Sequence, residues 1–301
     1  MVNSLFENFS LYLAVFSLAA LSGLISERSG IVNVGIEGYM IMGGLTTAII
    51  GQNLSESMGN WTQVMAIFAG ACVGGAISLL HSFASIKLKA DQIISGTAIN
   101  LLAQGIGLYM ATMGANTYIY GDYTVISVDS NRIFTFYLII AMLITLLTGL
   151  YFSFTRTGMR HISAGENPNA LEAAGVNVIK YRIIAVLFSG IIASLAGGIY
   201  TITARGSYFY GTADGMGFLA LAIMIVGQWR VKWVTLGAAG FAFFFALSKA
   251  LPINLEGGWI KTNAKLFQVL PFVISLGTMV GLSKWSKPPA AAGIPYDKAK
   301  R

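Results

Sequence analysis

Long apolar runs separated by short polar segments make up most of this 301-residue sequence. Several of the runs reach the roughly 20 residues that an α-helix needs to cross the hydrocarbon core of a bilayer. We place the apolar segments at residues 9–25, 31–51, 62–86, 92–113, 133–154, 183–204, 216–228, 233–251 and 265–283. The pattern predicts an all-α, polytopic membrane bundle of about 8–10 transmembrane helices. We expect this bundle to form a single transmembrane domain over residues 1–285, followed by a cytoplasmic tail over residues 286–301.

Two of the apolar segments are irregular. Segment 31–51 contains five glycines together with Asn33 and Glu37, and segment 216–228 is too short to cross the bilayer as an upright helix. Short or glycine-interrupted segments in corresponding halves of a chain point to a translocation site in transporters. The two segments run in opposite directions in the expected topology, so we expect broken helices and an internal inverted repeat. Alternatively, the glycines only allow membrane helices to pack closely.

A long polar stretch that contains residues typical of helix starts and helix ends lies mid-chain, in the sequence RTGMRHISAGENPNALEAAGVNVIKYR (156–182). Asn167 is a good N-cap, Pro168 suits the first helical position, and Gly175 suits the left-handed residue that ends a helix. These signals predict a short helix over residues 168–174, inside a loop that spans 155–182. Spacing places Ala170, Leu171 and Ala174 along one side of it, and we interpret this helix as a docking surface outside the bilayer.

Composition and charge support the membrane interpretation. Hydrophobic residues are 55% of the chain and charged residues 10%, whereas soluble domains have about 25% charged residues. The basic residues divide unevenly between alternate gaps, and the positive-inside rule places the richer set in the cytoplasm. That set comprises Arg28, Lys87, Lys89, Arg156, Arg160, Lys180, Arg182, Arg230, Lys232, Lys284, Lys287, Lys298, Lys300 and Arg301. The net charge of +7 therefore needs no nucleic-acid partner.

Motifs for catalysis or metal binding are missing from the sequence. It has no G-x-x-x-x-G-K-[ST] phosphate loop and no H-E-x-x-H, and its two histidines are far apart. The single cysteine, Cys72, allows no disulfide within the chain and no cysteine metal site. We therefore predict no catalytic residue, no metal site, no cofactor bound by this chain and no enzymatic activity of its own.

Polar residues within the apolar segments are candidates for a substrate pathway. Glu37 is the one acid that the predicted spans contain, and such a group is by default a functional hypothesis. Asn100 and Gln104 are four residues apart and share one helix face. Together with Asn33, they are the predicted pathway residues. The alternatives are structural: Glu37 accepts hydrogen bonds from backbone freed at a glycine-rich break, and the amides tie helices together.

Three stretches, SGIVNVGIEGYMIMGG (29–44), DQIISGTAINLLAQG (91–105) and the loop with its following span (156–198), resemble one family. It is the family of ABC importer permeases for branched-chain amino acids, ribose-type sugars and nucleosides, and the nucleoside branch is the most similar. The resemblance covers roughly residues 10–285. It implies a multi-pass protein of the bacterial cell membrane.

The resemblance also implies partners: a second permease subunit, an ABC ATPase that binds ATP and Mg²⁺, and an extracellular substrate-binding lipoprotein. It assigns coupling to the ATPase to a helix within the loop. The implied coupling residues are Glu166, Asn167, Pro168, Ala170, Leu171, Glu172, Ala174 and Gly175. In the widely known importer signature a glycine follows Glu-Ala-Ala after three residues, whereas here Gly175 follows at once. That departure indicates the larger-bundle type of importer.

These observations predict a permease subunit of an ABC importer that translocates nucleosides or related ribosyl or sugar-like solutes. One alternative is a secondary transporter of about ten helices that is driven by an ion gradient, and another is a non-transporting membrane scaffold. We expect Ala170, Leu171 and Ala174 to lie against the ATPase, with Glu172 at the rim. We expect Arg156, Arg160, Lys180 and Arg182 to anchor the ends of the loop at the lipid headgroups.

Overall fold

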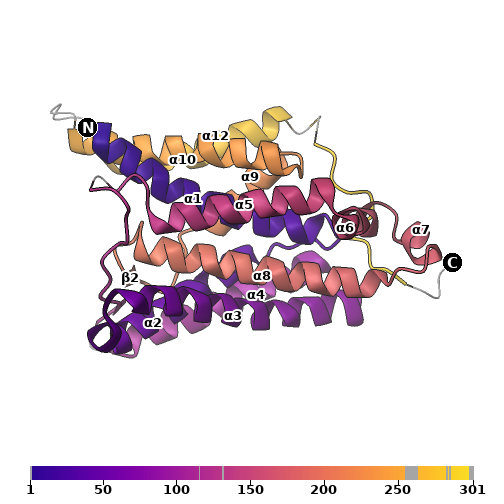
Figure 1. Cartoon of the computed structure of the whole chain (residues 1–301), viewed down its shortest axis with the longest axis horizontal. Helices are drawn as coiled ribbons and strands as arrows, with labels where there is room; N and C mark the ends of the chain where they lie inside the picture. Colours follow the sequence, from indigo (N-terminus) through magenta and orange to yellow (C-terminus); the bar gives the residue numbers. More distant parts are fainter. Residues whose placement is uncertain are drawn as a thin grey trace.

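The computed structural model of the chain describes residues 2–114, 116–130, 132–254, 264–282, 284 and 286–297. It is an elongated helical bundle with its long axis along the helices (Figure 1). The elements are α1 (Val2–Glu27), α2 (Ile36–Met58), the 3₁₀ turn η1 (Gly59–Trp61), α3 (Thr62–Ser82), the π-helical turn η2 (Phe83–Lys87), α4 (Gln92–Thr112), β1 (Ile119–Tyr120), α5 (Phe136–Phe154), α6 (Arg156–Glu166), α7 (Pro168–Ala173), α8 (Val178–Ile202), β2 (Tyr208–Phe209), α9 (Met216–Val226), α10 (Val231–Asn254) and α12 (Ala264–Leu282).

The all-α prediction is confirmed, because each predicted apolar segment contains one helix. Within the described residues, six continuous helical stretches are long and apolar enough to cross a membrane, and one of them joins α2 and α3. α9 is only 11 residues long, about 16 Å of helix, so it spans roughly half of the hydrocarbon core. In the predicted segment 31–51, residues 31–35 are not helical, and α2 begins at Ile36.

α1 and α8 form the centre of the bundle. α8 packs against α1, α2 and α3, and α1 also packs against α5, α9 and α10. The α2–α8 contact is a backbone approach: a Cβ on Gly43 would clash with the backbone of Ser194, and one on Gly197 would clash with that of Met40. Small residues that allow such close contact are typical of helix packing in membranes. The glycines of segment 31–51 thus serve both packing and the break before α2.

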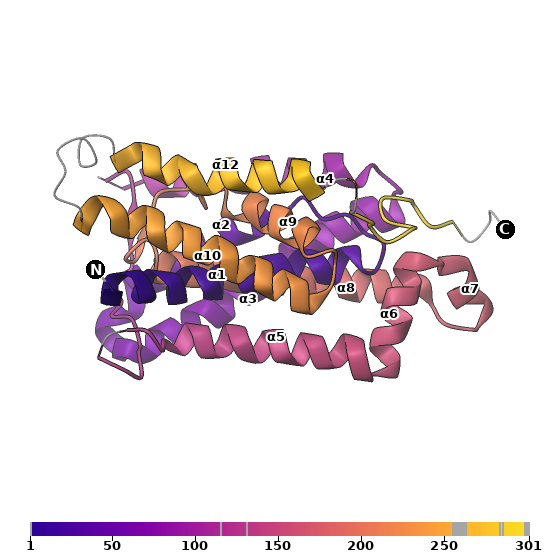
Figure 2. The same ribbon diagram turned by 90° about the horizontal axis from the view of Figure 1, so that it is seen from above.

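The two ends of the bundle differ in charge. α6, α7 and the C-terminal segment lie at one end, and the N-terminus, β2 and the C-terminal end of α10 lie at the other (Figures 1 and 2). At the end with α6, the described residues include Arg28, Lys87, Lys89, Arg156, Arg160, Lys180, Arg182, Arg230, Lys232, Lys284 and Lys287. The opposite end has far fewer cations in the described chain: Arg132, Arg205, Lys249 and Lys265. By the positive-inside rule, this distribution predicts that the α6 end is the cytoplasmic one.

The α6 end holds more regular structure than the sequence predicted. The loop 155–182 holds two helices, because α6 precedes the predicted short helix. The C-terminal segment packs onto the same end, where Ala291 N–H donates to the Gly165 carbonyl (2.8 Å) and Gly293 N–H to that of Gly30 (3.2 Å). The predicted tail 286–301 is thus docked as far as residue 297, and residues 298–301 lie outside the described chain.

Candidate translocation site and coupling surface

Residues 31–35, the inner re-entrant segment, enter the bundle as non-helical chain along α4. Val32 N–H donates to Gln92 Oε1 (2.6 Å) at the start of α4. The Asn100 side chain then donates to the Val34 carbonyl (2.9 Å) and accepts from Gly38 N–H (2.8 Å). Gln92 and Asn100 are eight residues apart, which is about 12 Å along a helix. α2 therefore begins near the middle of α4, well inside the bundle.

Residues 210–215, the outer re-entrant segment, come from the opposite end and also follow α4. A Cβ on Gly107 would lie 2.7 Å from the Gly211 carbonyl oxygen, so the two backbones touch. Gly211 (φ +87°) and Gly215 (φ +77°) adopt left-handed conformations that favour glycine. After Gly215 the chain turns into α9, whose N-terminus thus also lies inside the bundle.

Glu37 joins the two broken helices. Its carboxylate accepts hydrogen bonds from Gly215 N–H (2.8 Å) and Gly217 N–H (2.7 Å) at the N-terminus of α9. The first N–H groups of a helix have no partner within the helix, and the helix dipole favours negative charge there. Glu37 is 6% exposed. Glu37 therefore accepts hydrogen bonds from backbone N–H groups at a glycine-rich helix break, as its structural interpretation predicted. These N–H groups belong to the start of α9 rather than to α2.

A cavity of about 440 Å³ opens where the two segments meet. Its lining comes from α2, α4, the outer re-entrant segment and α9: Glu37, Ile41, Thr97, Asn100, Leu101, Gln104, Thr212, Asp214, Gly215 and Phe218. Three of the four predicted pathway residues, Glu37, Asn100 and Gln104, thus line one cavity. The Asn100 amide also ties α4 to the inner re-entrant segment, whereas Gln104 is exposed and makes no hydrogen bond within the described chain.

Asn33 does not belong to this cavity. Its side chain is fully buried, donates to Ser189 Oγ (2.8 Å) and accepts from Gly35 N–H (3.1 Å). The Nδ2 end of the amide therefore holds the inner re-entrant segment against α8, and the Oδ1 end bonds a peptide N–H within the segment itself. Asn33 thus lies apart from the cavity that the other three predicted pathway residues line, because a short amide at a helix break has close partners in the peptide groups around it.

An aromatic cluster at the outer end was not predicted. Tyr208 and Tyr210 stack with ring centroids 6.2 Å apart, and Tyr118 packs edge-on against Tyr208 (5.2 Å). The Arg205 guanidinium lies over the Tyr210 ring and forms an ion pair with Asp214, which lines the cavity. The run of three aromatic residues in SYFYG (207–211) was the signal in the sequence. The cluster comes directly before the outer re-entrant segment.

The ends of α7 follow the prediction. Asn167 Oδ1 accepts from Ala170 N–H (3.0 Å), Pro168 is the first helical residue, and Gly175 is left-handed with φ +79°. Val176 N–H donates back to the Leu171 carbonyl (3.2 Å) and satisfies one of the last free acceptors of the helix. Six helical residues would be marginal alone, so these caps are what define the segment.

The expected outward face of α7 needs a correction. Leu171 is 7% exposed and packs with Ala164 and Val178, under Tyr181 and Tyr296. It holds α7 onto α6, α8 and the C-terminal segment rather than facing outward. On α7 and the turn that ends it (168–175), the exposed residues are Asn169, Ala170, Ala173, Ala174 and Gly175. An apolar residue on a short helix packs on whichever neighbour is present, and the sequence did not show that α6 and the C-terminal segment were there.

Charged residues around α7 also have partners in this chain. Glu166 forms an ion pair with Arg28 (3.6 Å) and accepts from Ala290 N–H (3.3 Å), and Glu172 accepts from Val178 N–H (3.4 Å). Arg182 is 1% exposed and donates to the carbonyls of Ile294 (3.1 Å) and Ala164 (3.3 Å). The prediction that Arg182 anchors at the headgroups is therefore wrong.

His161 fixes α6 to the membrane domain. Its Nε2 lies 2.8 Å from the Ile25 carbonyl, and its Nδ1 lies 3.3 Å from the Tyr151 hydroxyl. Burial lowers the pKa of His161 to about 4, so the ring is neutral near pH 7. A neutral imidazole donates from Nε2 to the carbonyl and accepts at Nδ1 from the hydroxyl. His161 thereby bonds α6 to both α1 and α5.

Comparison with known proteins gives a consistent result. Residues 5–279 match the family described as Branched-chain amino acid transport system / permease component. The guanosine ABC transporter permease protein of Bacillus subtilis is 32% identical, over 96% of this chain and 95% of that protein. The nucleoside ABC transporter permease protein of Lactococcus lactis is 31% identical, over 97% and 96%. A putative glucose ABC transporter permease protein of Haloferax volcanii is 30% identical, over 87% and 82%.

Proposed function

The chain belongs to the family of branched-chain amino acid transport system permease components, and from that premise we propose that it carries nucleosides or related ribosyl solutes across the membrane as the permease subunit of an ABC importer. It is a multi-pass membrane protein and a transport subunit. The family match favours this function over the alternatives of an ion-driven transporter and a non-transporting scaffold. The names of the Bacillus and Lactococcus relatives support the nucleoside class.

One observation carries the proposed pathway: residues from two broken helices and α4 converge on a single cavity at mid-depth. Its lining suits a neutral ribosyl compound. Gln104, Thr97 and Thr212 offer hydrogen-bonding groups for sugar hydroxyls, and Leu101 and Phe218 offer apolar surface to a base. The tyrosine cluster lies at the outer approach, where aromatic rings stack on bases favourably. A solute would pass from that cluster along α4 to the cavity.

Energy comes from a partner in this proposal. ATP and Mg²⁺ bind to an ABC ATPase, and this chain binds no cofactor of its own. A second permease subunit and an extracellular substrate-binding lipoprotein complete the importer. We assign coupling to the hairpin of α6 and α7, with Ala170 and Ala174 on its exposed surface. Asn167, Pro168 and Gly175 shape the hairpin, and Glu166, Leu171 and Glu172 hold it on this chain.

The proposal is tested by uptake into vesicles that contain this chain with its ATPase and receptor. We expect nucleoside uptake that requires ATP and the ATPase. Uptake by this chain alone, driven by a proton or sodium gradient, would contradict the function.

The coupling surface has its own test. Ala174→Asp places a charge on the exposed surface and should impair ATPase association without lowering the stability of the chain. Leu171→Asp should instead lower stability, because it buries a charge among apolar side chains. If Ala174→Asp supports full association and uptake, the hairpin surface is not the coupling contact.

A further inference from the structure

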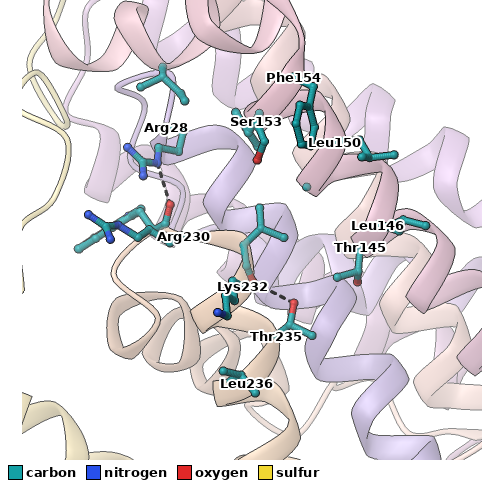
Figure 3. A pocket seen from close by; sticks show the side chains of 15 residues that line it. Arg28, Thr145, Leu146, Leu150, Ser153, Phe154, Arg230, Lys232, Thr235 and Leu236 are labelled. Carbon is teal, nitrogen blue, oxygen red and sulfur yellow. Dashed lines mark hydrogen bonds between the residues drawn. The ribbon is translucent and has the colours of Figure 1, made fainter.

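A groove of about 680 Å³ lies between α5 and α10 at the cytoplasmic end of the bundle, separate from the translocation cavity. Figure 3 shows the α5 and α10 side chains facing each other across it. The α5 wall consists of two rows spaced by four residues: Thr145, Gly149 and Ser153, and Leu146, Leu150 and Phe154. The two ends of each row are eight residues apart, which is about 12 Å of depth from the membrane surface. The opposite wall is formed by Val231, Lys232, Thr235 and Leu236 of α10.

The apolar residues of this groove are uncovered. Leu146 and Leu236 are exposed, and Phe154 is 81% exposed at the cytoplasmic end of α5. α5 packs on α1 but makes little contact with α10, so the two helices leave a lateral opening. A membrane helix with such a side faces lipid or another protein.

Three cations sit at the headgroup end of the groove. Arg28, Arg230 and Lys232 line it, and Arg28 and Arg230 lie next to each other in Figure 3. Arg28 has partners, because its Nε donates to the Trp229 carbonyl (2.7 Å) and its guanidinium pairs with Glu166 (3.6 Å). Within the described residues, neither Arg230 nor Lys232 forms an ion pair. The group therefore carries positive charge that this part of the chain does not neutralise.

We propose that this groove binds an anionic diacyl phospholipid of the cytoplasmic leaflet. The phosphate lies among Arg28, Arg230 and Lys232, and an acyl chain follows Leu146, Leu150 and Leu236 into the bilayer. Charge complementarity selects the lipid class, since a zwitterionic headgroup would bring its own cation to the same place. Basic pockets between transmembrane helices on the cytoplasmic side are known to bind anionic headgroups. The volume is also within the roughly 300–1,000 Å³ of small-molecule sites.

The electrostatics of Arg28 agree with this assignment. Burial lowers the pKa of the Arg28 guanidinium from its ordinary value, Glu166 opposes this change, and the nearby charge of Arg230 lowers the pKa further. A phosphate placed among these groups would relieve the repulsion between the two arginines. It would also give Arg230 the bidentate partner that its planar group favours.

The proposal predicts selective photolabelling. The full-length chain, with any subunits that copurify, is placed in nanodiscs with trace phosphatidylglycerol or phosphatidylcholine carrying the same photoreactive acyl chain. We expect phosphatidylglycerol to label peptides 142–155 and 231–240 preferentially. The variant Arg230→Gln/Lys232→Gln should reduce this labelling, by about fivefold for each cation removed.

A matched control is available on the same helix. Lys249 is an exposed cation near the outer end of α10, and Lys249→Gln should leave the labelling unchanged. A second variant, Leu150→Trp, fills the groove without changing charge and should also reduce labelling. Thermal unfolding of each variant shows whether the chain is still folded.

Several results would overturn the lipid assignment. Equal labelling by both lipids, or labelling that survives the double substitution, would show a surface with no headgroup preference. Displacement of the lipid by an excess of inorganic phosphate would show a site for a free anion. Cross-linking of Ser153→Cys to another polypeptide, in place of lipid labelling, would show that a protein covers the groove.

Discussion

The inner and outer re-entrant segments bring two broken helices to the same point in different ways. The inner segment is fastened by side chains of other helices: Gln92 and Asn100 of α4, His81 of α3 and Ser189 of α8. The outer segment is held by its contact with α4 at Gly107 and by the Glu37 carboxylate, and its Asp214 accepts from the Tyr200 hydroxyl of α8 (2.6 Å) and pairs with Arg205. The inner segment is therefore bonded at Val32, Asn33 and Val34 in turn, whereas the side-chain bonds of the outer segment are concentrated at its end, at Asp214 and Gly215.

This difference predicts different roles in transport for the inner and outer re-entrant segments. A segment bonded at one end can change position at a lower cost than one bonded at successive residues. In an importer, that element is the one expected to move when the cavity opens and closes. Glu37 is the connection between the two walls, and its loss should have the largest effect.

Glu37→Ala removes the acceptor for two buried N–H groups of α9. Each buried donor without a partner costs about 1–3 kcal/mol, so we expect unfolding stability to fall by several kcal/mol and uptake to be lost. Glu56→Ala is the control, because Glu56 is an exposed acid at the other end of α2. Equal stability of the two variants in denaturant titrations would show that Glu37 does not hold α9.

Asn100→Ala breaks the connection between α4 and the inner re-entrant segment. It leaves the Val34 carbonyl and Gly38 N–H without their partner, which should cost about 2–3 kcal/mol. Gln104→Ala makes the same kind of change four residues along α4, where the amide has no partner in the described chain. If both variants lose the same stability, the inner segment is not fastened in the way described.

Gly211→Ala tests the packing of the outer re-entrant segment on α4. The residue has φ +87°, and a Cβ there would lie 2.8 Å from the backbone of Leu108, so we expect a loss of about 1–3 kcal/mol. Gly206→Ala also has positive φ (+59°) but has open space around the new methyl group. Thermal unfolding should therefore show a larger loss for Gly211→Ala than for Gly206→Ala. The reverse order would contradict close packing of Gly211 on α4.

Gln104→Ala should change transport more than stability. Its amide is exposed in the cavity, and removing one hydrogen bond to a solute costs about 0.5–1.5 kcal/mol. We therefore expect the KM for uptake to rise several-fold at unchanged stability. Unchanged kinetics with every nucleoside that the protein carries would remove Gln104 from the pathway.

Much of this arrangement follows from local signals in the sequence. Apolar length predicted each of the membrane helices, and Asn167, Pro168 and Gly175 predicted α7 because caps act within a few residues. Helical spacing placed Asn100 and Gln104 on one face, and both line the cavity. The two broken segments were predicted from glycines and from short apolar length.

Long-range contacts were the part that the sequence did not show. The partners of Glu37 are 178 and 180 residues away. Leu171 and Arg182 were expected at outer surfaces, but α6 and the C-terminal segment bury them. Local patterns give no information about which distant segment covers a side chain. The same limit explains Asn33, whose partner Ser189 lies on α8.

The most direct test of the pathway is labelling of single cysteines by a water-soluble thiol reagent, after Cys72→Ser. We expect Gln104→Cys to be labelled in at least one transport state and to be protected by the transported nucleoside, while Asn33→Cys stays unlabelled. Protection shows that the solute occupies the cavity between the two broken helices. Failure to label Gln104→Cys in any transport state, or labelling that no nucleoside prevents, would contradict a pathway through this cavity.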